Sequence, residues 1–236
     1  DEIHTDRYGR IKVRFHWDRR GRGDQDSSCW IRVAHPWAGQ NWGMVAIPRV
    51  GQEVVVEFLE GDPDRPLITG SVYNADQLPP YALPQHMTQS GIKSRSTPGG
   101  NGSNYNEIRF EDRRGAEELR LHAERDQVLQ TRRDRVESVG NESHLIIGQD
   151  LREQCGGDHH LRVGGDQNVA LGGSHSFSVA QDWQGQVGLR LAAEAGQEIH
   201  LKAGIKLVLE AGAQLTLKVG SSFIEIGPGG VTLAGP

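Results

Sequence analysis

Few residues in this sequence are spaced for catalysis. Ser174 stands beside His175, but neighbouring residues on a strand point to opposite faces, so a nucleophile–base contact is not expected. Asp62 and Asp64 flank Pro63, and a turn explains this pair of carboxylates without acid–base chemistry. No zinc-protease, nucleophile-elbow, CxxC or phosphate-loop motif occurs. We therefore predict that the chain is not an enzyme and has no catalytic residue, no metal site and no cofactor.

Cysteine content and charge exclude further classes. Cys29 and Cys155 are the only cysteines, too few for a disulfide framework or a cysteine-based zinc site. The formal net charge of −5 argues against a generally basic nucleic-acid binder and against a polybasic membrane anchor. No apolar run approaches the roughly 18 residues of a membrane span. The chain opens without Met and without a signal peptide, so we expect a fragment whose default origin is the cytoplasm.

The strongest pattern is a glycine at every eighth residue. The chain has 31 glycines, and ten of eleven consecutive slots at this spacing hold one, with Ala180 in the remaining slot. An α-helix is excluded because eight residues do not fit its 3.6 period and each interior glycine costs about 1 kcal/mol. We interpret these glycines as corners between short strands. The predicted corners are Gly140, Gly148, Gly156, Gly164, Gly172, Gly188, Gly196, Gly204, Gly212 and Gly220.

Between the corners, apolar and polar residues alternate. The alternation is clearest late in the array, where Ile205, Leu207 and Leu209 are separated by Lys206 and Val208. Such alternation indicates strands with one buried face and one face in water. A single-chain β-helix is one solution, although its usual units have six or nine residues. We favour three chains that wind together, because each chain then pairs with its neighbours and no lateral strand edge remains.

The residues predicted to face the interior change character along the array. Four residues after each apolar slot stand Ser143, Leu151, His159, Gln167, His175, Trp183, Leu191, Ile199, Leu207, Leu215 and Phe223. The first half of this column is polar and the second half is apolar. Three copies of His159 or His175 around an axis could hold an ion or waters. Solvated or hydrogen-bonded histidines explain them more simply, and Cys155 is expected to pack as a small apolar residue.

The first 74 residues have a different pattern. Five short alternating segments, at 7–17, 29–37, 43–50, 53–61 and 66–74, predict a small closed barrel of the OB type. OB barrels often bind single-stranded nucleic acid through aromatic residues in a basic groove, and Trp17, Trp30, Trp37 and Trp42 raise that possibility. These residues carry 10 Lys and Arg against 11 Asp and Glu, so we interpret the tryptophans as core or subunit-contact residues.

The remaining segments complete the predicted domain order. Residues 1–74 form the OB barrel, 75–104 a linker rich in Pro, Gly, Ser and Asn, 105–138 a neck hairpin and the start of the prism, and 139–236 the octad-repeat prism. The hairpin has strands in 106–112 and 117–124. Asp126–Ser138 could be a short helix or irregular first octads. The predicted fold is all-β: a five-stranded OB-type barrel followed by an intertwined trimeric triple-stranded β-helix.

Several long motifs carry a family resemblance. They are HTDRYGRIKVRFHWD (4–18), SSCWIRVAHPWAGQNWG (27–43), IPRVGQEVVVEFLEGDPDRPLITGSVYN (47–74), SGIKSRSTPGG (90–100), YNEIRFEDRRGAEELRLHAERD (105–126) and GSSFIEIGPGGVTLAGP (220–236). In this order they resemble VgrG, the valine–glycine repeat spike of type VI secretion, which is similar to contractile phage tail needles. The resemblance implies a homotrimer with an OB barrel and a triple-stranded β-helix.

The resemblance also implies a function and partners. It implies a structural, membrane-puncturing spike that is assembled in the bacterial cytoplasm and then secreted into target cells without a signal peptide. The implied partners are a PAAR-repeat tip protein at the C-terminal end, effector proteins, and the secretion tube protein through a hub domain missing before Asp1. The target-cell membrane is met only by penetration, and no nucleic-acid partner is implied. Neither a lysozyme domain after the barrel nor a toxin after the prism is expected.

The C-terminal end is the predicted tip-binding platform, since a blunt prism ends in open strand edges and apolar side chains that invite capping. The predicted tip residues are Phe223, Ile224, Ile226, Gly227, Pro228, Gly229, Gly230, Val231, Leu233 and Pro236. An alternative function, from a different class, is a ligand-binding module whose OB barrel contacts nucleic acid or glycan.

Overall fold

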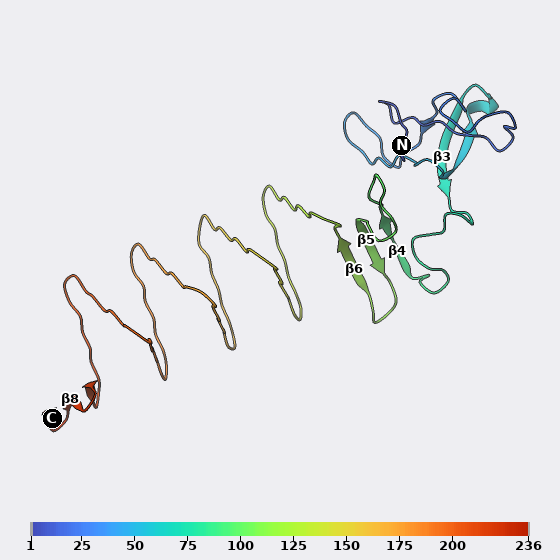
Figure 1. Ribbon diagram of the computed structural model, residues 1–236. Helices are drawn as coiled ribbons and strands as arrows, with labels where there is room; N and C mark the ends of the chain where they lie inside the picture. The colour runs from blue at the N-terminus through green and yellow to red at the C-terminus, as the bar shows by residue number, and fades with distance from the viewer. Residues whose placement is uncertain (1, 236) are drawn as a thin grey trace. The chain divides into compact units, whose positions relative to one another are not determined.

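The computed structural model describes residues 2–235 and, within them, contains strands and one short 3-10 turn but no α-helix (Figure 1). The chain divides into two compact units, Asp1–Leu145 and Ile146–Pro236. The elements in chain order are β1 (Arg32–Val33), β2 (Glu53–Phe58), η1 (Leu59–Gly61), β3 (Pro66–Val72), β4 (Gln89–Lys93), β5 (Glu107–Glu111), β6 (Glu118–His122), β7 (Leu215–Val219), β8 (Ser222–Gly227) and β9 (Gly230–Ala234). The predicted all-β class is confirmed.

The first sheet, in the order β1-β3-β2, holds the small core of the N-terminal unit. β1 runs parallel to β3, and β2 runs antiparallel to β3 with a register shift between Val55 and Val56. Ile11, Ile31 and Ile68 are buried at its centre. Ile11 and Ile31 exchange both backbone hydrogen bonds, at 3.0 and 2.8 Å, so the segment around Ile11 joins the sheet through one bridge.

The strands of this region are fewer and shorter than the sequence predicted. Segment 7–17 contributes only the bridge at Ile11, and 43–50 contributes only a bridge between Ala38 and Gly43. Alternation marks which side chains face the core, but a ladder also needs a partner strand along its whole length. Turns interrupt that partnership: Asp6 accepts the amide hydrogens of Tyr8 and Arg10, and Asp18 accepts those of Arg20 and Gly21.

The second sheet has the order β4-β5-β6 and follows the linker. β5 and β6 match the predicted hairpin, whereas β4 lies inside the stretch expected to be a linker and was not predicted. The register places Gly91 opposite Arg109, and Arg109 opposite Arg120. We call this sheet the neck sheet. It has two antiparallel pairings and no register shift among its residues.

After the neck sheet the chain bends at a regular spacing. Bends occur at each of Gly140, Gly148, Gly156, Gly164, Gly172, Gly188, Gly196, Gly204 and Gly212, and also at Ala180, while Gly220 lies in the turn after β7 with φ +58°. Asp126–Ser138 contains no helix. Bends at 124–125 and 132–133 continue the eight-residue spacing toward the N-terminus. Figure 1 shows this part of the chain, coloured yellow to orange, as an open coil without strand arrows.

The third sheet, β7-β8-β9, is an antiparallel meander near the C-terminus. Its register places Leu217 opposite Ile224, and Ile224 opposite Leu233. The β8–β9 connection runs through Pro228 and Gly229 into Gly230, whose φ of +117° favours glycine. We call this meander the terminal sheet.

The close packing of the neck sheet at Gly91 gives a first prediction. A Cβ atom at Gly91 would meet the carbonyl oxygen of Ile108 and the hydroxyl of Tyr81, and would lie 3.0 Å from the Cα atom of Arg109. Gly91→Ala should therefore lower stability by roughly 1–3 kcal/mol, the usual cost of overpacking. Thermal unfolding followed by circular dichroism measures the effect.

Gly70 in β3 is the matched control, because a Cβ atom there meets nothing within 4 Å. Gly70→Ala should change stability by less than about 0.5 kcal/mol. Equal midpoints for the two variants would contradict the packing at Gly91.

Candidate self-association surfaces and tip

The repeat array exposes all of its side chains. Every residue from 124 to 214 is exposed, and even the best-shielded large apolar side chains there, such as Ile147 and Val179, are 42% exposed. Among the described residues, no backbone–backbone hydrogen bond links 124–214 to any other segment. A segment with this many apolar residues and unpaired peptide groups needs a partner surface to be stable. The array is therefore an interface along its whole length.

The neck sheet exposes its apolar face, whereas its polar face is partly covered. Its register places Ile92, Ile108, Phe110, Leu119 and Leu121 on one face, and all five are exposed. The opposite face carries the charged residues, and there Glu107 is only 5% exposed. An ordinary amphipathic sheet buries its apolar side, so this inversion indicates that the apolar face meets another chain.

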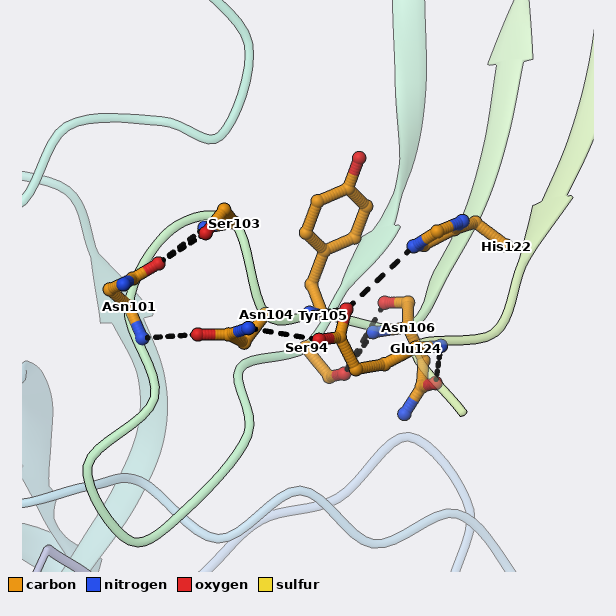
Figure 2. Close-up of polar contacts among 8 residues, drawn as sticks. All are labelled: Ser94, Asn101, Ser103, Asn104, Tyr105, Asn106, His122 and Glu124. Atoms are coloured by element: carbon orange, nitrogen blue, oxygen red, sulfur yellow. Dashed lines mark hydrogen bonds and ion pairs between the residues drawn. The ribbon is translucent and has the colours of Figure 1, made fainter. Parts of the chain in front are cut away.

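A polar network fixes the point where the neck sheet ends and the array begins (Figure 2). The Glu124 carboxylate accepts hydrogen bonds from Asn104 Nδ2 at 2.9 Å and from the Tyr105 backbone amide at 3.2 Å. The Asn104 side chain is the main cause of a lowered pKa at Glu124. The Glu124 amide donates to Asn106 Oδ1 at 2.9 Å.

The same network connects two other strands. Ser94, just after β4, and Asn106, just before β5, exchange hydrogen bonds, with Asn106 N donating to Ser94 Oγ at 3.0 Å and Ser94 N donating to Asn106 O at 2.9 Å. The Tyr105 ring lies between Lys93 Nζ, 3.9 Å from its centroid, and the His122 ring, 4.7 Å away. The network therefore ties Glu124, the first residue of the array, to residues next to the neck strands.

Glu2 ties the OB region to the loop that follows β4. Its carboxylate accepts hydrogen bonds from Thr97 Oγ1 and from the Gly99 amide, both at 2.7 Å. Arg49 and Arg95 approach it at 3.7 and 3.5 Å. The Gly99 hydrogen bond is the largest cause of a lowered pKa at Glu2, followed by the Thr97 hydroxyl. We call this group the Glu2 clamp.

Arg49 extends the clamp. Its Nη2 donates to the Arg95 carbonyl at 2.7 Å, so one guanidinium touches both partners of the junction. The OB region and the neck sheet therefore meet through named polar contacts within the N-terminal unit.

The predicted tip residues separate into two faces and a turn. Ile224, Ile226, Val231 and Leu233 share one face of the terminal sheet with Leu217, and all five are exposed. Phe223 lies on the opposite face, in register with Lys218 and Ala234. Gly227, Pro228, Gly229 and Gly230 form the end of β8, the turn and the start of β9. Pro236 lies outside the described residues.

The side chains considered for chemistry are dispersed. His159 and His175 are exposed and lie in different octads. Cys155 is exposed, and its Sγ lies 3.5 and 3.4 Å from the carbonyl oxygens of Gly157 and Asp158. Asp62 accepts the Asp64 amide at 3.0 Å, which is the expected turn contact. Within residues 2–235, no three His, Cys, Asp or Glu side chains are grouped to hold a metal ion, and no helix is long and apolar enough to cross a bilayer.

Two features were not located by sequence reasoning, for different reasons. The bend at 132 lies in the stretch for which irregular first octads were one of two alternatives, and the bend at 124 was not expected. Both positions carry a residue other than glycine, Glu124 and Arg132, so counting back in steps of eight from Gly140 is what locates them. The Glu2 clamp joins residues more than ninety positions apart. No local pattern marks such a contact.

Comparison with known proteins finds a family match in each of two parts of the chain. Residues 1–73 match the family described as the type VI secretion system/phage-baseplate injector OB domain. Residues 90–202 match the family described as the bacteriophage T4 gp5 C-terminal trimerisation domain.

Individual relatives agree with these two families. The chain is 61% identical over 141 residues to the type VI secretion system spike protein VgrG1a of Pseudomonas aeruginosa, covering 60% of this chain and 22% of that protein. It is 46% identical over 147 residues to the spike protein VgrG3 of Vibrio cholerae, covering 62% and 14%. It is 43% identical over 152 residues to a Vibrio cholerae protein named actin cross-linking toxin VgrG1, covering 64% and 14%. The chain thus spans about a fifth or less of the length of these relatives.

The Glu2 clamp gives the second prediction. A carboxylate whose pKa is lowered on folding stabilises the folded state above its ordinary value of 4.5, and this contribution is lost as the pH falls through the folded value. Glu2→Gln should lower the thermal midpoint at pH 7, because a neutral amide cannot accept both hydrogen bonds as the carboxylate does. The difference from the unmodified protein should shrink below pH 4.5.

Glu60→Gln is the control. Glu60 pairs with Arg65 at 2.9 Å, but its side chain is 83% exposed, so the substitution should have little effect at either pH. A Glu2→Gln midpoint that differs from the unmodified protein equally at pH 7 and pH 3 would contradict the clamp.

Proposed function

Because the chain belongs to the VgrG spike family, we propose that it forms the homotrimeric shaft of a membrane-puncturing spike in a contractile, type VI secretion machine. The observation that carries this proposal is the continuous exposure of residues 124–214, with alternating apolar side chains and without internal backbone pairing. Three copies satisfy both needs at once, since each octad pairs with octads of the other two chains. The match to a trimerisation domain over residues 90–202 supports the number three.

The function follows from stiffness. In an intertwined trimer, bending or splaying must break many hydrogen bonds at once, and no chain can unwind alone. Each buried Leu, Ile or Val adds roughly 1.5–3 kcal/mol. The resulting rod resists unfolding kinetically, which is what a shaft pushed through a membrane requires. The role of the chain is structural, in line with relatives named as spike proteins.

The domain layout serves this role. Residues 1–74 form the OB barrel, 75–104 connect it to the neck, 105–138 include the neck hairpin and the first octads, and 139–236 form the prism. The glycine corners let each chain turn from one face of the prism to the next. The polar first half of the interior can retain water near His159 and His175, while the second half is dry.

The proposed partners lie at the two ends of the spike. A secretion tube protein connects through the hub domain that the family resemblance implies, and a PAAR-repeat tip protein sits on the C-terminal platform. Effector proteins are carried with the spike. The spike is assembled in the bacterial cytoplasm and then expelled into a target cell. The turn Gly227–Gly230 and the open edge of β9 offer backbone groups to the tip protein.

The trimer gives the third prediction. Light scattering should return a mass of about three times 25.9 kDa. Leu207→Asp should destroy or strongly destabilise the trimer, at a cost of at least about 3 kcal/mol, because it buries three like charges in the interior. The matched substitution Lys206→Asp, one residue away on the predicted outer face, should leave the mass unchanged.

A monomeric mass for the unmodified chain would overturn the proposal. Equal behaviour of the two variants would overturn the assignment of inner and outer faces.

The platform gives the fourth prediction. Gly229 lies in the β8–β9 turn, and a Cβ atom there meets nothing within 4 Å, so Gly229→Trp can be accommodated without disturbing the terminal sheet. The trimer mass should be unchanged, whereas binding of a purified PAAR-repeat protein in calorimetry should weaken at least tenfold because the indole obstructs access to the turn and to the edge of β9. Lys206→Trp, on the predicted outer face of the prism, is the control and should bind normally. Unchanged affinity of the Gly229→Trp trimer would place the tip protein elsewhere.

A further inference from the structure

A loop of the OB region presents two tryptophans to solvent. Residues 36–46 are all exposed, and within them Trp37 is 64% and Trp42 is 57% exposed. Met44 and Val45 extend the apolar surface. We call residues 36–46 the tryptophan loop. Trp30, by contrast, is half-buried and stacks on His4, so the tryptophans of this region do not share one role.

The tryptophan loop has a defined shape. Ala38 and Gly43 form a bridge, the Gly39 amide donates to the Trp42 carbonyl at 2.9 Å, and the Met44 amide donates to the Trp37 carbonyl at 2.9 Å. The two indole rings meet edge to face with their centroids 5.2 Å apart. The chain fixes this aromatic pair before any partner is bound, which reduces the entropy lost on binding.

Two glycines make this shape possible. A Cβ atom at Gly39 would overlap the Trp42 ring, so the ring lies directly against the backbone there. Gly43 has a φ of +137°, a conformation that side chains disfavour. Glycine at positions 39 and 43 therefore allows the loop to hold two large aromatic side chains at its surface.

The composition of the loop fits a protein interface. The run from Pro36 to Pro48 contains no Lys, Arg, Asp or Glu, although 24% of the chain is charged. Tryptophan and methionine are enriched at protein interfaces, and charged residues are depleted from interface centres. A base-stacking role would need nearby cations to contact phosphates, and this run has none. The surface therefore fits a protein partner better than a nucleic acid.

The contacts between this segment and the neck sheet indicate which protein is the partner of the loop. The run is followed directly by Arg49, which contacts both Glu2 and Arg95 in the Glu2 clamp, so the segment that carries the loop is tied to the neck. If the exposed apolar faces of three neck sheets come together, three OB regions come together with them. β3 ends at Val72 and β4 begins at Gln89, so a short connection links each OB region to its neck sheet. When three neck sheets associate, this connection keeps the effective concentration of the OB regions for one another near the millimolar range.

We propose that the tryptophan loop packs against another copy of this chain, so that the trimer is closed at the OB level as well as along the array. This inference rests on the proposed trimer. It extends the subunit contact upstream of residues 90–202, the span that matches the trimerisation family.

Hydroxyl-radical footprinting of the intact chain, read by mass spectrometry, tests the inference. Trp and Met side chains oxidise readily, so the reaction reports each residue separately. Trp37, Trp42 and Met44 should react several-fold more slowly than their single-chain exposure predicts. Met87, which is 78% exposed, and Trp17, which is 68% exposed, serve as internal references for open side chains. Light scattering on the same sample gives the oligomeric state.

The outcomes separate this inference from the proposed function. A trimer whose tryptophan loop is protected supports both. A trimer whose loop reacts at its single-chain rate overturns the inference and leaves the trimeric shaft intact. A monomer overturns both.

A paired variant adds a second readout. Trp37→Ser with Trp42→Ser should keep the trimer mass, since the array holds the chains together, and should lower the thermal midpoint of the OB region more than Trp17→Ser does. A double variant as stable as the Trp17→Ser control would count against the loop contact. Protection of the loop that appears only on adding a different protein or an oligonucleotide would reveal another occupant and would equally overturn the inference.

Discussion

The whole structure depends on the need to satisfy the backbone and apolar side chains of residues 124–214. Among the described residues, the segments between these bends form no backbone–backbone hydrogen bonds with one another. The peptide groups and the Leu, Ile and Val side chains of this stretch are then left to other chains. The elements before residue 124 lead into this pairing between chains, and the elements after residue 214 end it.

The two small sheets flanking the array show the same dependence in milder form. The neck sheet and the terminal sheet each pair their own three strands, yet each leaves one apolar face in water. On the polar face of the neck sheet, Glu107 is buried and Arg109 is half-buried. In these two sheets the chain forms its own backbone hydrogen bonds but leaves an apolar face for another chain. In the array between them, the backbone hydrogen bonds are also left to other chains.

The sequence predicted the parts of this fold that repeat or alternate. Glycine at a fixed spacing needs only composition and counting to be found, and the bends occur at those glycines. The neck hairpin was visible because Ile108, Phe110, Leu119 and Leu121 alternate with charged residues. Segments 7–17 and 43–50 alternate equally well but form only isolated bridges, since side-chain periodicity does not supply a partner strand.

What the sequence could not predict depends on long-range or side-chain contacts. β4 is short and contains Gly91, a residue that lowers strand propensity, and it is a strand because β5 pairs with it. The Glu2 clamp joins the start of the chain to Thr97 and Gly99, with no local signature. The shape of the tryptophan loop follows from the Trp42 ring lying on Gly39, which composition alone does not reveal.

The eight-residue spacing has a consequence for how such a shaft can change over time. Inserting or deleting a single residue within the array would move every later corner and would exchange the inner and outer faces of the following strand. Deleting or duplicating a whole unit preserves both. Descendants of this chain are thus free to grow or shrink only in quanta of one repeat, and shaft length becomes a trait that evolution adjusts in discrete steps.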